Sequence, residues 1–290
     1  MRIIDTFMFH NEYDILELRL SEHYDHVDKI VIVECDRTYT GRYKGFNLEK
    51  NLDRYTRWMD KIEYIKIENC PSVENLSHET AWDNEWWQRD NMSKGWNDVT
   101  DEDVILMSDL DEIVRPEALQ FIRNTNYGFY RLNMPGFYFK LNYMDTYQHY
   151  SAWGKAYRGF KTQPRFMRNC DDVPGKSKIT LHHAGWHFGW VGDVDFIKNK
   201  LKSFSHVEFD TELNQENIDN LDKIIEQGGD HIRPNNQKTW RKVAINEYYP
   251  KTILNNIEKY RKYILPDGQK SVTDYWTGGI LEIDEFNSNL

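Results

Sequence analysis

The sequence predicts an α/β fold, a mixed sheet flanked by helices, followed by a helical C-terminal part. Apolar β-branched segments alternate with helix-period segments through the first hundred residues. An alternating run over residues 128–143, bent at Pro135-Gly136, then indicates antiparallel strands. From Asp195 onward the sequence is polar and helix-like. With 39% hydrophobic residues in 290, the chain can bury a substantial core.

The expected elements follow from local patterns. Strands are predicted at residues 3–9, 29–35 and 62–67 and from Val104. The second, K-I-V-I-V-E-C, is the nearly continuous apolar run of a strand buried on both faces of a parallel sheet. Helices are predicted at residues 79–96, 117–124, 196–204, 217–227 and 253–263.

Composition excludes several classes of protein. The 37 basic and 47 acidic residues leave a net charge of −10 without a long basic run, so nucleic acid is not an expected partner. No segment approaches the ~20 apolar residues of a membrane span and the start lacks a signal-peptide pattern, so we expect a cytoplasmic protein. Cys35, Cys70 and Cys170 are far apart, which argues against a disulfide framework or a cysteine zinc site.

An acidic cluster ends the fourth expected strand. In V-I-L-M-S-D-L-D-E-I, Asp109, Asp111 and Glu112 crowd within four positions, where like charges repel. Ligands of open α/β sheets bind beyond the carboxyl ends of strands, and carboxylate oxygens suit Mg²⁺ or Mn²⁺ holding a diphosphate. A solvated turn before the helix at Pro116 is the competing interpretation of this pattern.

A second cluster, L-H-H-A-G-W-H-F-G-W, combines histidines and tryptophans. Imidazoles can ligate a metal or move a proton, and a Trp face such as that of Trp186 can carry a sugar ring. His187, between aromatic residues and beside glycine, is the better functional candidate. Hydrogen-bonded core positions are the simpler interpretation for His182 and His183.

Two further groups of side chains have possible roles. Candidate partners for phosphate or for the acidic cluster are Arg37, Lys44, Arg89 and Arg158. A platform for a sugar acceptor could use Trp82, Trp86, Trp87, Tyr147 and Trp153. For each of these residues taken singly, an ordinary surface or core position is the simpler interpretation.

Six blocks in series resemble glycosyltransferase family 17. They are I-I-D-T-F-M-F-H-N-E-Y-D-I-L-E-L-R-L, V-D-K-I-V-I-V-E-C-D-R-T-Y-T-G, S-D-L-D-E-I, H-A-G-W-H-F-G-W, K-x-x-S-F-S-H and Y-Y-P-K-T-I-L-N-N-I-E-K-Y. The similarity runs in order from about residue 3 to about residue 265. Such a series is far more specific than one D-x-D pattern.

The resemblance implies a GT-A type fold, a divalent metal (Mn²⁺ or Mg²⁺), inversion at the anomeric carbon and a UDP-sugar donor, which is UDP-N-acetylglucosamine in the characterised members. By position, Asp109 and Asp111 would contact metal, diphosphate and ribose, with Glu112 beside them. Apart from the resemblance, we expect His187 to contact metal or phosphate. The residues implied for the nucleotide side are Phe9, His10, Asn11, Glu12, Glu34, Arg37 and Thr38, with Arg89 facing the D-x-D pair.

The implied organisation is a catalytic core over residues 1–195 and a helical part over residues 196–290. Within the core, residues 1–115 would bind the nucleotide-sugar and residues 116–195 the acceptor. A general base must accept the proton of the acceptor hydroxyl. Because His187 is assigned to metal or phosphate, carboxylates remain for this role, and the candidates are Glu208, Asp193 and Asp145.

Membrane anchors found in Golgi members of the family have no counterpart here, which favours a bacterial or viral cytoplasmic setting. The acceptor would then be a lipid-linked, polysaccharide or protein-bound glycan. The sequence leaves two other functions open. A metal-dependent nucleotide-sugar hydrolase or pyrophosphorylase would also use an acidic cluster at a strand end, and a non-catalytic glycan-binding protein would also be rich in aromatic residues.

Overall fold

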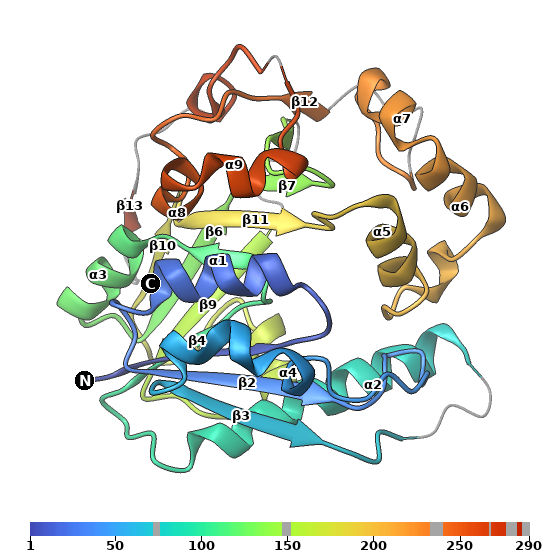
Figure 1. Ribbon diagram of the computed structural model, residues 1–290. Coiled ribbons are helices and arrows are strands. Elements are labelled where there is room, and N and C mark those ends of the chain that lie inside the picture. Colours follow the sequence, from blue (N-terminus) through green and yellow to red (C-terminus); the bar gives the residue numbers. More distant parts are fainter. Residues whose placement is uncertain (72–75, 147–151, 233–239, 267, 277–282, 286–290) are drawn as a thin grey trace.

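Four parallel strands form one side of the larger sheet in the computed structural model, which describes residues 1–71, 76–146, 152–232, 240–266, 268–276 and 283–285 (Figure 1). The strands are β1 (Ile3–Met8), β2 (Lys29–Cys35), β3 (Ile62–Ile67) and β4 (Val104–Met107). β1 lies between β2 and β4, and β3 lies on the far side of β2. The predicted strands are confirmed.

The larger sheet has eight strands in the order β13-β10-β6-β9-β4-β1-β2-β3. Its second half contains β6 (Phe129–Met134), β9 (Ala152–Arg158), β10 (Lys178–Leu181) and β13 (Ile283–Glu285). β9 runs antiparallel to both β4 and β6, whereas β10 is parallel to β6. The sheet is therefore mixed, as the sequence predicted.

A second mixed sheet has the order β12-β8-β7-β11-β5. Its strands are β5 (Glu112–Val114), β7 (Gly136–Tyr138), β8 (Tyr143–Asp145), β11 (Gly185–Gly189) and β12 (Trp240–Lys242). Because β4 ends at Met107 and β5 begins at Glu112, the acidic turn formed by residues 108–111 is the link between the two sheets.

The closeness of β11 to β5 depends on glycine. A Cβ atom at Gly185 would lie 2.0 Å from the carbonyl oxygen of Ile113, which no larger residue could accept without a backbone shift. The antiparallel register of these strands places His187 opposite Glu112. Gly185 thus brings the histidine cluster to the acidic turn.

Helices cover both faces of the parallel strands. The helical segments of the first half are α1 (Tyr13–His23), η1 (Glu49–Trp58), α2 (His78–Asp90), η2 (Asn91–Trp96), α3 (Pro116–Asn124) and α4 (Pro164–Asn169). One apolar cluster joins α1, η1 and α3 to side chains such as Ile3 and Ile30, and another joins η2 and α4 to Ile4 and Val31. Both faces are buried, which explains the continuous apolar sequence of β2.

The C-terminal part contains α5 (Val194–Leu201), η3 (Val207–Phe209), α6 (Glu212–Asp219), α7 (Leu221–Gln227), α8 (Lys251–Asn255), α9 (Ile257–Tyr260), η4 (Arg261–Tyr263) and η5 (Val272–Asp274). The helices predicted at 217–227 and 253–263 are each interrupted, at Asn220 and Asn256. This part also supplies β12 and β13 to the two sheets.

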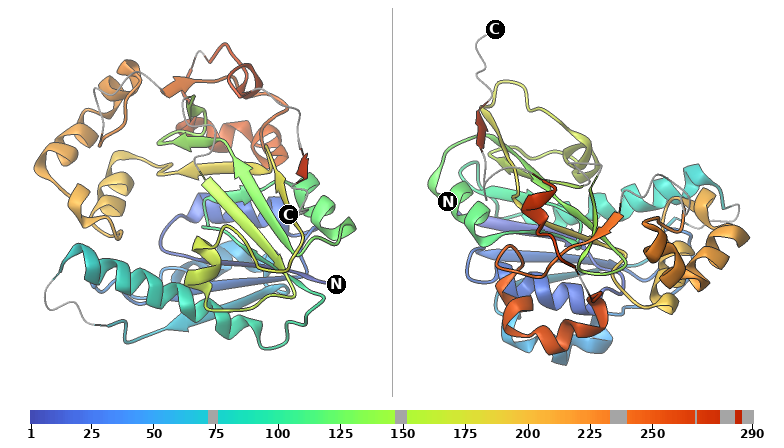
Figure 2. Two further views of the ribbon diagram at one scale, coloured as in Figure 1. Left: turned by 180° about the vertical axis from the view of Figure 1, so that it is seen from behind. Right: turned by 90° about the horizontal axis from the view of Figure 1, so that it is seen from above.

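The helices α5, α6 and α7 lie at the same end of the molecule as α2 in opposite views (Figures 1 and 2). The segment after α5 is bonded to α2, since the Ser205 hydroxyl donates to Glu85 over 2.5 Å. It is also bonded to the loop after β2, where the Tyr39 amide donates to the Ser203 carbonyl over 3.1 Å. In the part of the chain that the structure describes, no helix is both long and apolar enough to cross a membrane.

A buried ion pair fixes the acidic turn. The guanidinium of Arg19 on α1 and the carboxylate of Asp5 on β1 are both fully buried, 2.5 Å apart. Arg19 also donates to the carbonyls of Asp109 (2.6 Å) and Glu112 (3.1 Å) and to the Ser108 hydroxyl (2.7 Å). Burial alone would raise the pKa of Asp5, but Arg19 and then His23 hold that pKa well below its usual range.

Replacing Asp5 by Asn should lower the free energy of unfolding by about 3–5 kcal/mol at pH 7, because Arg19 would remain buried without its anion. The Asp5 carboxylate has a lowered pKa in the folded state, so its contribution is complete above the unfolded pKa near 4 and declines as the pH falls below it. Urea denaturation followed by tryptophan fluorescence between pH 7 and pH 3 measures both effects.

The matched control is Asp53→Asn, at an exposed position on η1, which should change stability by less than about 0.5 kcal/mol. The difference between Asp5→Asn and the unmodified chain should shrink toward acidic pH. A constant difference across the whole range would contradict the assignment of charge to Asp5.

Candidate active site

A cavity of about 180 Å³ lies at the carboxyl ends of β1, β2 and β4, where open α/β sheets bind ligands. Five segments of the chain line it: the end of β1, the loop after β2, α2, the acidic turn, and the end of α5 with the residues after it. In that order, the lining contains Met8, Phe9, His10 and Glu12; Arg37, Thr38, Tyr39 and Lys44; Glu85, Gln88 and Arg89; Asp109, Leu110 and Asp111; Lys200, Ser203 and Phe204.

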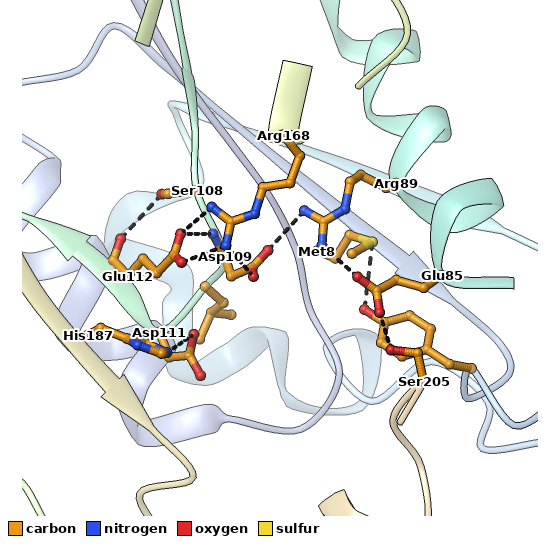
Figure 3. A network of polar contacts seen from close by, with 12 residues as sticks. Met8, Glu85, Arg89, Ser108, Asp109, Asp111, Glu112, Arg168, His187 and Ser205 are labelled. Atoms are coloured by element: carbon orange, nitrogen blue, oxygen red, sulfur yellow. Dashed lines mark hydrogen bonds and ion pairs between the residues drawn. The ribbon is translucent and has the colours of Figure 1, made fainter. Parts of the chain in front are cut away.

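Two arginines neutralise one half of the acidic cluster (Figure 3). Asp109 binds Arg89 of α2 over 2.9 Å and Arg168 of α4 over 3.0 Å. Arg168 also binds Glu112 over 2.6 Å, and the Glu112 carboxylate accepts from the Asp109 amide. Burial opposes ionisation of Asp109, but Arg168 and Arg89 outweigh it and lower the pKa of that carboxyl well below its usual range.

A lysine and a histidine face the other half. Lys200 of α5 lies between Asp111 (3.2 Å) and Glu12 (3.3 Å), and His187 Nε2 lies 3.5 Å from Asp111. Burial opposes charge on each group, yet their attraction lowers the pKa of Asp111 and raises those of Lys200 and His187. The protein's own cations therefore offset the repulsion among the crowded carboxylates.

Two polar atoms after β1 are available for a ligand. His10 Nε2 and Asn11 Oδ1 are buried and accept or donate no hydrogen bond among the described residues. Burial, with Lys44 and Lys200 nearby, lowers the pKa of His10 to about 4 against the attraction of Glu12, so the imidazole is neutral at pH 7. Because buried polar groups are nearly always hydrogen-bonded, these atoms favour a polar ligand in or beside the cavity.

Most residues implied for the nucleotide side line this cavity. They are Phe9, His10, Glu12, Arg37, Thr38, Arg89, Asp109 and Asp111. Glu112 accepts from the Asp109 amide and His187 lies beside Asp111, but neither residue is part of the lining. Asn11 is adjacent in sequence to His10 and Glu12.

Glu34 and Trp186 lie outside the lining. Glu34 is buried beneath the loop after β2, where it binds Lys44 over 2.6 Å and accepts from the Tyr64 hydroxyl over 2.6 Å. Trp186 is 2% exposed, and its indole nitrogen donates to the Tyr248 carbonyl over 3.1 Å. Glu34 touches the cavity wall through Lys44, whereas Trp186 packs in the core.

The three carboxylates predicted as general base also lie outside the lining. Asp193 caps α5 by accepting from the Phe196 amide over 2.8 Å. Asp145 ends β8 and is paired in register with Trp240 of β12. Glu208 lies on η3, where it contacts His206 over 2.7 Å. Their role as base stays a prediction.

Two of the remaining candidates, Arg158 and His183, make hydrogen bonds within the fold. Arg158 donates to the carbonyls of Ile122 and Thr125, and buried His183 shares a hydrogen bond of 2.8 Å with the Tyr248 hydroxyl. Half-buried side chains on α2 are Trp82, Trp86 and Trp87. Tyr147 lies outside the described residues, as does the side chain of Trp153.

Sequence reasoning assigned no role to Arg168, Lys200 or Glu85. Lys200 begins the K-x-x-S-F-S-H block, so the resemblance contained a signal for it. Arg168 and Glu85 lie in no such block. Arg168 contacts Asp109 across 59 positions, and Glu85 pairs with Arg89 four residues on and accepts from Ser205 across 120 positions. Such contacts appear only once the chain is folded.

The fold and cavity define an α/β protein with a ligand site of mixed charge at the carboxyl ends of parallel strands. The sequence model of glycosyltransferase family 17 matches residues 1–270, so the chain belongs to that family.

Three similar proteins are beta-1,4-mannosyl-glycoprotein 4-beta-N-acetylglucosaminyltransferases. Those of Rattus norvegicus and Mus musculus are each 22% identical to the chain over 312 residues, and that of Homo sapiens is 22% identical over 311 residues. The alignments cover 96% of this chain and 57% of each relative, so the chain spans little more than half their length.

Replacing Arg168 by Gln should lower the free energy of unfolding by about 2–4 kcal/mol. Glu112, which is 2% exposed, would lose the cation that compensates its burial. The expected loss is smaller than for a fully buried pair because the Arg168 side chain is 20% exposed. Urea denaturation at pH 7 gives the value.

Arg165→Gln, on the same helix, is the matched control. Its partner is Asp90, and the two side chains are 34% and 20% exposed, so its loss should cost no more than about 1 kcal/mol. Equal destabilisation by the two substitutions would show that α4 packing, rather than neutralisation of the acidic cluster, explains the effect.

Proposed function

We propose that the chain transfers a sugar from a UDP-sugar to a hydroxyl of a glycan or glycoconjugate, with inversion and with help from a divalent metal. The proposed donor is UDP-N-acetylglucosamine, which agrees with the names of the related N-acetylglucosaminyltransferases. The proposed arrangement is the GT-A type, with the nucleotide at the carboxyl ends of β1, β2 and β4.

The observation that carries the proposal is the pairing of opposite charges in one cavity. Carboxylates of the acidic turn lie beside cations from α2 and α5, with Arg37 and Lys44 in the same lining. A diphosphate needs cationic donors, and a metal that bridges it needs carboxylate oxygens. The lining provides both kinds of group within one small volume.

Asp111 and His187 fit a metal. Two ligands about 2.1 Å from the same ion lie no more than about 4.2 Å apart, and these two atoms are 3.5 Å apart. Mn²⁺ suits carboxylate oxygen and, like its neighbours in the transition series, can accept imidazole nitrogen. The ion would supply charge neutralisation for the departing diphosphate.

The chain's own residues would position the donor. Lys200 can exchange Glu12 or Asp111 for a phosphate oxygen, since its ammonium group already lies in the cavity wall. Arg89 can act on the same phosphates while Asp109 holds it in place. His10 and Asn11 would pair with hydroxyl or amide groups of the nucleotide-sugar.

Attack by the acceptor would require a base that takes the hydroxyl proton as the glycosidic bond to UDP breaks on the opposite face of the sugar. Among the described residues, the carboxylates in the lining are Glu12, Glu85, Asp109 and Asp111. Glu208, Asp193 and Asp145 lie outside this lining, and the role of base stays a prediction for them.

Titration calorimetry with UDP and UDP-N-acetylglucosamine, in Mn²⁺ and then in EDTA, tests the donor site. Both ligands should bind in Mn²⁺ and much more weakly in EDTA. Asp111→Asn should remove this difference, because the carboxylate charge that favours the ion would be lost. If the unmodified chain bound UDP and UDP-N-acetylglucosamine equally strongly in Mn²⁺ and in EDTA, the result would contradict a role for the metal in donor binding.

Lys200→Gln should weaken UDP binding in saturating Mn²⁺ by about 10-fold to 100-fold, the effect of removing a charged hydrogen bond worth about 1.5–3 kcal/mol. Lys198→Gln on the same helix is the control, since its ammonium pairs with exposed Asp219 away from the cavity. Equal effects of the two substitutions would remove Lys200 from the donor site.

The rate at which UDP-N-acetylglucosamine is consumed distinguishes sugar transfer from the two alternative functions. A transferase should consume UDP-N-acetylglucosamine much faster when a suitable glycan acceptor is present. Equally fast consumption without acceptor would indicate a nucleotide-sugar hydrolase. Glycan binding without any nucleotide binding would instead indicate a glycan-binding protein.

A further inference from the structure

A group of metal-ligating side chains lies outside the donor cavity. His78, at the first position of α2, meets His206 and Glu208, which lie between α5 and α6. One ligand atom from each lies within 4.8 Å of the others. His206 Nδ1 is 2.7 Å and His78 Nε2 is 3.7 Å from different oxygens of the Glu208 carboxylate. None of the three residues lines the cavity.

The hydrogen bonds show which nitrogen of His78 carries the lone pair. The indole N–H of Trp82 donates to His78 Nε2 over 2.9 Å, so this nitrogen is the acceptor, and an ion that binds it would displace the indole N–H. The same nitrogen faces Glu208. The ring of His206 lies edge-on to Trp82 with centroids 4.9 Å apart, which holds the second imidazole beside the first. Neutral imidazole is the form that ligates metals.

We propose that His78, His206 and Glu208 form a second metal site, specific for a borderline transition metal such as Zn²⁺. Two imidazoles and one carboxylate are a ligand set of three-ligand zinc sites, in which water completes the tetrahedron. The side chains are 39–48% exposed, so small rotations can bring the ligand atoms to the spacing of about 3.5 Å that a tetrahedral ion requires. Nitrogen ligands disfavour Mg²⁺ and Mn²⁺ relative to Zn²⁺.

The site would join two walls of the donor cavity. α2 supplies Glu85 and Arg89 to the lining, and the segment before η3 supplies Ser203 and Phe204. At present a hydrogen bond of 2.5 Å between Ser205 and Glu85 connects them. A bound ion would add coordination bonds between residues 128 positions apart in sequence, His78 and His206, and would restrain the segment that carries Ser203 and Phe204.

Calorimetric titration of the full chain with ZnCl₂, with any polyhistidine tag removed, tests the site without nucleotide or acceptor. One high-affinity Zn²⁺ per chain should bind and should raise the melting temperature. His206→Ala, His78→Ala and Glu208→Gln should each weaken binding by more than about 10-fold, since even loss of an outer-shell contact costs roughly that much. Excess Mn²⁺ should not displace the Zn²⁺.

Two controls locate the ion. His26→Ala, at a half-buried histidine after α1, should leave Zn²⁺ affinity unchanged. Asp111→Asn should also leave it unchanged, because the donor cavity shares no ligand with this group. Loss of binding in Asp111→Asn but not in His206→Ala would assign the ion to the donor cavity and overturn the proposal, as would the absence of Zn²⁺ binding. Neither result depends on whether the chain transfers a sugar.

Discussion

The buried pair of Arg19 and Asp5 is the constraint on which the site depends. An unpaired guanidinium in the core would be costly, so Arg19 must find an anion and acceptors for its remaining N–H groups. The anion is Asp5 on β1, and the acceptors are the carbonyls of Asp109 and Leu110 in the acidic turn and of Glu112 directly after it. Because the turn is held through its carbonyls, its carboxylates remain free to face the cavity.

The acidic turn is tolerated because cations from other elements surround it. Arg168 comes from α4, Arg89 from α2 and Lys200 from α5, and each contacts a carboxylate of the turn. A dianionic diphosphate alone would upset this balance of positive and negative charge, and so would a dication alone. A diphosphate and a dication that bind together preserve the balance, which is a physical reason for metal and nucleotide to bind as a pair.

The sequence allowed prediction of the features that depend on local pattern. β1 to β4 and the position of Asp109 and Asp111 at a strand end follow from apolar runs and their termination. β5 was not predicted, because three residues give too short a pattern. The contacts of Arg168 and Lys200 were not predictable either, since long-range pairing depends on how α4 and α5 pack. For Glu34, the position at a strand end was predicted, but its surroundings were not. A lysine, a tyrosine and backbone amides surround its carboxylate.

The C-terminal part completes the site rather than merely covering the core. Lys200 at the end of α5 is the cation that faces both Glu12 and Asp111, and Ser203 and Phe204 close the same cavity. Only a few residues further on, His206 and Glu208 contact the start of α2. A short segment therefore touches the donor cavity at one end and contributes His206 and Glu208 to the group with His78 at the other. Any ligand that orders one end reduces the conformational freedom left to the other, so the two ends should be energetically coupled.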